Sequence, residues 1–102
     1  MTPQRGSTVD TVASTSPRTK NVTSSSTEVL PANTGRVGSS FINASDQKMC
    51  LGLGAPAVMG SDIYLAANGG AWDGMIGPLV WTGAVNAIAA NGSANTLCIV
   101  EV

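Results

Sequence analysis

Few residues of this chain belong to types that commonly carry out chemistry in proteins. The sequence has no histidine, which excludes Ser-His and Cys-His catalysis and metal sites built on imidazole. Asp62 and Asp73 could pair as in a glycoside hydrolase, but each lies beside an expected turn or strand start, where aspartate commonly bonds to its own backbone. A calcium site needs several closely spaced oxygen ligands, and only Asn68 and Asp73 come near this. We predict no catalytic residue, no metal site and no enzymatic activity.

One glycine-rich stretch matches the fingerprint of dinucleotide binding. Gly52, Gly54 and Ala57 have the spacing G-x-G-x-x-A and follow an expected strand. The fingerprint requires a helix to begin at its end, because the helix N-terminus holds the pyrophosphate. Here Pro56, Gly60 and a further strand follow instead. We interpret the glycines as turn and loop residues and expect no cofactor.

The cysteines and the large aromatic residues are the remaining side chains with special chemistry. Cys50 alternates with apolar neighbours along its strand, and Cys98 lies in a strand that is apolar on both faces. Two cysteines do not make a disulfide scaffold, so we expect free thiols that are buried or half-buried. Trp72, Trp81 and Tyr64 are of the type that stacks on sugars. In a chain with 4% aromatic residues, we expect the two tryptophans to be core or subunit-interface anchors.

The composition limits the classes of partner. The chain has 102 residues, enough for one domain. Only 11% of the residues are charged, and a surface so poor in charge favours self-association or docking into an assembly. A net charge of −1 provides no field to steer nucleic acid, and no apolar stretch is long enough to cross a bilayer. We therefore expect protein partners, with no nucleic acid and no membrane.

The first 27 residues differ from the rest of the chain. They are dominated by serine, threonine and proline, with three valines as the only large apolar side chains after the first methionine. Such a segment cannot bury enough surface to offset the entropy lost on ordering. We predict an extended N-terminal arm over residues 1–27, either disordered or ordered by a partner. Its expected partner contacts are Val9, Val12, Arg18 and Lys20.

The chain from residue 28 to 102 is predicted to form one β-domain. Alternation with a period of two is clearest at Met49, Leu51 and Leu53, and turn signals such as Asn68-Gly69-Gly70 recur between short apolar runs. The expected strands are 27–30, 36–43, 47–53, 62–65, 78–82, 85–89 and 96–102. This pattern is typical of an all-β fold, either an antiparallel β-sandwich or a jelly-roll-like domain.

Several segments from residue 29 to 102 resemble small structural proteins of tailed-phage virions. They are Leu-Pro-Ala-Asn-Thr-Gly-Arg at 30–36, Phe-Ile-Asn-Ala-Ser-Asp at 41–46, Cys-Leu-Gly-Leu-Gly at 50–54, Gly-Ser-Asp-Ile-Tyr-Leu-Ala at 60–66, Trp-Thr-Gly-Ala-Val-Asn-Ala-Ile-Ala-Ala at 81–90 and the final Val-Glu-Val. The resemblance implies a head decoration (cement) protein on the major capsid protein, or a head fibre. Such a protein is assembled in the host cytoplasm and lies on the capsid surface. The alternative is a tail, fibre or receptor- or carbohydrate-binding module.

The resemblance and the low charge together predict a homo-oligomer, with a trimer as the first expectation. Val80 and Ile99 are expected on strand faces opposite their core neighbours, which would leave apolar side chains at the surface. A subunit contact would cover such side chains. We expect Trp72 or Trp81 at or near this contact.

Overall fold

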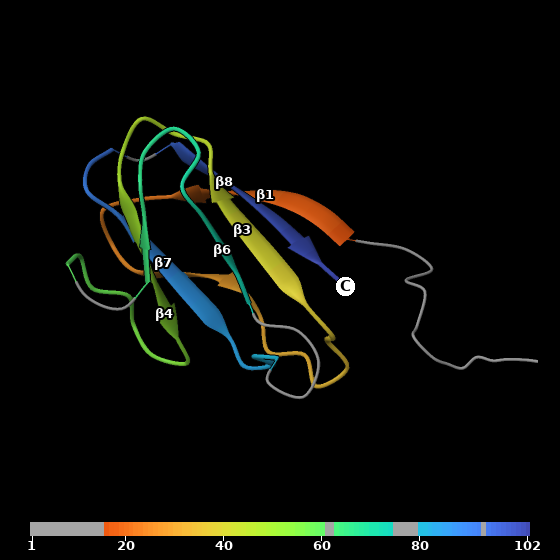
Figure 1. Cartoon of the computed structure of the whole chain (residues 1–102). Coiled ribbons are helices and arrows are strands. Elements are labelled where there is room, and N and C mark those ends of the chain that lie inside the picture. Colours follow the sequence, from red (N-terminus) through yellow and green to blue (C-terminus); the bar gives the residue numbers. More distant parts are fainter. Residues whose placement is uncertain (1–15, 61–62, 75–79, 93) are drawn as a thin grey trace, which may run out of the picture.

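The computed structural model describes residues 16–60, 63–74, 80–92 and 94–102 (Figure 1). This part of the chain contains eight strands and no helix. The strands are β1 (Ser16–Val22), β2 (Thr27–Leu30), β3 (Ser39–Asn43), β4 (Met49–Leu53), β5 (Ile63–Leu65), β6 (Ala71–Asp73), β7 (Val85–Ala89) and β8 (Asn95–Glu101).

The strands form two four-stranded antiparallel sheets that pack face to face. One sheet has the order β1-β8-β3-β6 and the other β2-β7-β4-β5. We call them the β8 sheet and the β7 sheet, after a central strand of each. Figure 1 shows β8, β3 and β6 side by side in one layer and β7 beside β4 in the other. The prediction of an all-β antiparallel sandwich is confirmed.

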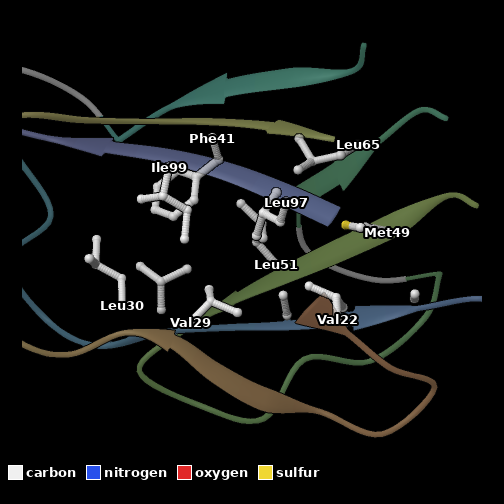
Figure 2. Close-up of a cluster of buried hydrophobic side chains, with 12 residues drawn as sticks. Val22, Val29, Leu30, Phe41, Met49, Leu51, Leu65, Leu97 and Ile99 are labelled. Atoms are coloured by element: carbon white, nitrogen blue, oxygen red, sulfur yellow. The ribbon is translucent and has the colours of Figure 1, made fainter. Parts of the chain in front are cut away.

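The core lies between the two sheets and is mostly aliphatic. Alternation decides which residues enter it: in β8, Leu97 and Ile99 point inward, and in β7 Val85, Ala87 and Ala89 do so. Figure 2 shows how side chains from the two sheets meet. The cluster consists of Val22, Val29, Leu30, Phe41, Met49, Leu51, Leu65, Val85, Ala87, Ala89, Leu97 and Ile99. Burying each large side chain contributes about 1.5–3 kcal/mol, which is what holds the sheets together.

A loop over residues 54–60 folds back onto the outer face of the β7 sheet. The side-chain amide of Asn86 donates to the Ala55 carbonyl oxygen at 2.7 Å, and the backbone N–H of Ala57 donates to the Ser26 hydroxyl at 2.8 Å. A Cβ on Gly52 would lie 2.6 Å from the same Ala55 oxygen, so only glycine allows this approach. Gly54 is a bend residue as predicted, whereas Gly52 lies within β4.

β1 corrects the predicted boundary between arm and domain. The sequence predicts an arm over residues 1–27, but residues 16–22 form an edge strand that pairs with β8 from Ser16↔Glu101 to Val22↔Asn95. Val22 is fully buried in the core. The physical reason is that ladder hydrogen bonds use the backbone, so a polar segment can extend a sheet without a core of its own. Residues 1–15, with Val9 and Val12, lie outside the described residues.

Three further features of the strands differ from the prediction. Residues 80–82 lie in a loop rather than a strand, and 78–79 fall outside the described residues. β6, between two predicted turns, was not expected. Ile99, predicted at the surface, is 1% exposed, because β8 turns its odd-numbered residues inward and leaves Cys98 and Val100 outside.

Candidate interaction surface

The outer face of the β8 sheet carries exposed apolar side chains at its centre. Ile42 of β3 and Val100 of β8 are 43% and 36% exposed. Cys98 is the ladder partner of Ile42 and is half-buried. Thr19 of β1 and Ala71 of β6 flank this pair on the two sides. One row of outward side chains therefore crosses all four strands. Cys98 and Ile42 form its apolar middle.

A shallow hollow adjoins this row on the same sheet. It has a volume of about 170 Å³, and Val100, Val102 and Asp73 are among the residues that line it. Its full lining is Gly38, Ser39, Ser40, Asp73, Val100 and Val102. Asp73 is the one charged side chain among the outward strand positions of this sheet that the structure describes. The face therefore has the composition of a protein contact: an apolar centre with charge at the margin.

Trp72 and Trp81, predicted as interface anchors, both pack against the core of their own chain. Trp72 is the ladder partner of Phe41, and the two ring centroids lie 5.8 Å apart. The indole N–H of Trp81 donates to the Ala84 carbonyl oxygen at 3.0 Å. A Cβ on Gly83 would lie 2.6 Å from the Trp81 ring, so this glycine allows the indole to approach the backbone closely. Both tryptophans remain half-buried, and their place at a subunit contact stays a prediction.

A buried arginine closes one end of the sandwich. The Arg36 side chain is 0% exposed, and its Nε donates to Glu101 Oε2 at 2.8 Å. Its Nη1 donates to the carbonyl oxygens of Trp81 at 2.9 Å and Gly83 at 3.0 Å, and its Nη2 to that of Pro31 at 2.6 Å. These bonds tie the end of β8 to the segments that follow β2 and precede β7. Because its charge and its nitrogens are engaged within the chain, we assign Arg36 a structural role.

Glu101 is the acidic partner of this cluster. Burial by itself raises the pKa of its carboxyl, but hydrogen bonds from Arg36 and Asn33 and the positive charges of Arg36 and Arg18 outweigh burial. The pKa of Glu101 therefore lies below its ordinary value. Arg18, predicted as a partner contact, faces this carboxylate within its own chain, with Nη2 3.4 Å from Oε1. Lys20, predicted to have the same role, is exposed on β1.

The two cysteines lie on opposite outer faces of the sandwich. Cys50 points outward from β4 in the β7 sheet and is fully buried, whereas Cys98 points outward from β8 and is half-buried. Both thiols are free, which confirms the prediction made from the sequence.

An exposed aromatic side chain lies on the other sheet. Tyr64 of β5 is 57% exposed and is the ladder partner of Cys50. Val58, in the loop over the same sheet, is 55% exposed. A solvent-facing phenol of this kind can stack on or hydrogen-bond to a ligand, which makes Tyr64 a second, smaller candidate contact.

Other kinds of site are not seen in the described residues. No three side chains among histidine, cysteine, aspartate and glutamate converge there as metal ligands. That part of the chain also has no helix long and apolar enough to span a membrane. Comparison with known proteins gave no match to a family model, a curated protein or a solved structure.

Proposed function

We propose that this protein is a structural component of a phage virion, a decoration or cement protein that attaches to the major capsid protein and stabilises the shell. The observation that carries the proposal is the outer face of the β8 sheet, where Ile42 and Val100 are exposed and Asp73 is the one charge among the described outward positions. Such a face suits attachment to another protein surface. The resemblance of residues 29–102 to virion proteins supports the same class.

Attachment of many copies to one particle explains how a small face can suffice. A contact limited to this one sheet face is weak in a single copy. Repetition over a shell converts weak contacts into tight attachment, provided that the copies are linked as oligomers. A homotrimer fits this role, with Trp72 or Trp81 near its subunit contact. For the residues before Ser16 we keep the predicted role of a tether, in which Val9 and Val12 fill small pockets of the capsid protein.

The test places a charge in the centre of the proposed face. Ile42→Glu is added to purified particles that lack the wild-type protein. The matched control is Val58→Glu, at a somewhat more exposed position in the loop over the other sheet. We expect binding at least about tenfold weaker for Ile42→Glu, since a carboxylate would be buried without a partner. The control should bind like the wild type.

Two results would count against the proposal. Equal binding of both variants would move attachment away from the β8 sheet. Mass spectrometry of purified virions that finds no copy of the protein would remove the virion role altogether.

A carbohydrate- or receptor-binding module is the second candidate, because Tyr64 is more than half exposed. In that case glycans would change the intrinsic fluorescence of the protein, and Tyr64→Ala would abolish the change. Intact glycan binding by Ile42→Glu would distinguish the two functions.

A further inference from the structure

β1 is attached to the sandwich differently from the central strands. It pairs with β8 over seven positions, yet Val22 is the one side chain that its described residues add to the core. The positions beside the core residues Leu97 and Ile99 are taken by Lys20 and Arg18, which are charged and reach solvent. β1 is therefore held mainly by backbone hydrogen bonds to β8.

The contacts between β1 and β8 do not depend on both strands belonging to the same copy of the chain. Any chain of this sequence presents the same backbone groups, the same Arg18 for Glu101 and the same Val22 for the core. The Val22 carbonyl oxygen accepts a hydrogen bond at 3.0 Å from the side chain of Asn95, which another copy's Val22 would accept equally well. An exchange of β1 between two copies thus preserves every contact that the strand makes.

The link between β1 and β2 has the properties of a hinge. Residues 23–26 join an edge strand of one sheet to an edge strand of the other. Ser24, Ser25 and Ser26 are exposed, and the Thr23 hydroxyl bonds only to the backbone of Ser25 within the same turn. The Thr23 carbonyl oxygen accepts from the N–H of Ala89 at 2.8 Å, which anchors the body side of the link. Opening this turn at Ser24 and Ser25 releases β1 and leaves the hydrogen bond from the Ala57 N–H to the Ser26 hydroxyl in place.

We propose that β1 is an exchangeable strand, and that the edge of β8 accepts β1 from a second copy of this chain. Exchange of an identical element is a low-cost route to assembly, because the contacts are the same in the closed and exchanged forms. It is favoured wherever copies stand close together, since a high local concentration offsets the entropy of association. The inference holds whether or not the protein decorates a capsid, because it concerns contacts between copies alone.

The native cysteine makes the proposal directly testable. Thr19 is the ladder partner of Cys98, and both point to the outer face of the β8 sheet. Facing residues of antiparallel strands have Cα atoms about 4.5–5.5 Å apart, within the range that a disulfide spans. A cysteine at position 19 therefore reports which copy's β8 lies beside β1. Cys50 is fully buried in the other sheet and does not interfere.

The experiment uses two full-length chains that cannot form this disulfide alone. The first carries Thr19→Cys and Cys98→Ser, and the second is the wild type with a size tag. They are unfolded together, refolded at high protein concentration and oxidised. The control replaces the first chain with Val58→Cys and Cys98→Ser, which has an exposed cysteine away from β8. Non-reducing gels then measure the linked heterodimer.

We expect at least tenfold more linked heterodimer with Thr19→Cys than with the control. A yield equal to the control at every concentration would overturn the proposal. Circular dichroism of each chain confirms folding beforehand, and Cys98→Ala replaces Cys98→Ser if the serine prevents it. Oxidised Thr19→Cys with the native Cys98 gives a further readout: linked multimers support exchange, and linkage confined to single chains at high concentration contradicts it.

Discussion

On the β7 sheet, residues 54–60 fold back over the outer face, whereas the middle of the outer face of the β8 sheet stays open to solvent. The covering loop depends on Gly52, whose missing side chain lets the Ala55 carbonyl approach, and it buries Ala57 to 3% exposure. On the β8 sheet, Ile42 and Val100 remain exposed. Where the chain does not cover an apolar sheet face itself, a partner is the natural cover. The difference between the two faces therefore locates the proposed contact.

The largest expected effect on stability comes from Arg36, at the end of the sandwich where its hydrogen bonds tie the two sheets together. Arg36→Met should lower the free energy of unfolding by about 3–5 kcal/mol, because Glu101 and three carbonyl oxygens would lose their buried partner. Urea unfolding followed by tryptophan fluorescence measures this. Lys48→Met, at an exposed position, is the control and should change stability by less than about 0.5 kcal/mol. A loss as small as the control's would mean that Arg36 does not clamp the sheets.

An intermediate effect is expected from a methyl group added to the covered face. Gly52→Ala should destabilise the protein by about 1–3 kcal/mol, since its Cβ would meet backbone atoms of Ala55 and Ala57. The matched change on the open face, Ala71→Ser, should stay within about 0.5 kcal/mol. Thermal unfolding of the two variants compares the faces directly. Equal stabilities of Gly52→Ala and Ala71→Ser would mean that the loop does not pack closely against the β7 sheet.

The smallest expected effect is on how the stability of the protein depends on pH. The pKa of Glu101 is lowered in the folded protein, so its contribution to stability is fully present above the ordinary value of 4.5. That contribution is lost as the pH falls from there through the folded-state pKa. Urea midpoints between about pH 6 and 3 should therefore fall more steeply for the wild type than for Glu101→Gln. Parallel curves would show that the Arg36–Glu101 pair adds no acid sensitivity.

The parts of the fold that sequence reasoning recovered are those in which side chains specify the strand. Leu51 and its alternating neighbours identify β4, and the run before the C-terminus identifies β8. β1 and β6 were missed because they join the sheet through backbone hydrogen bonds, on which side-chain patterns carry little information.

The candidate surface was only partly predictable for a different reason. In β8 both sets of alternate residues are apolar, so the pattern did not decide whether Ile99 or Val100 faces solvent. Arg36 and Glu101 meet although 65 positions separate them, and no local signal reveals such a pair. The association that the low charge content predicts stays a prediction, and the exposed apolar side chains of this surface are Ile42 and Val100 rather than the predicted Ile99.

The central place of β8 in its sheet also sets the order in which the fold can form. β1 and β3 both take β8 as their ladder partner, yet β8 is synthesised long after them: Val22 and Asn95 are separated by 73 positions. Closing so long a loop is entropically costly and slow. During synthesis β1 therefore has no partner strand in its own chain until β8 has been made. The interval between the synthesis of β1 and that of β8 is when the proposed exchange between copies would meet the least competition from the chain's own β8.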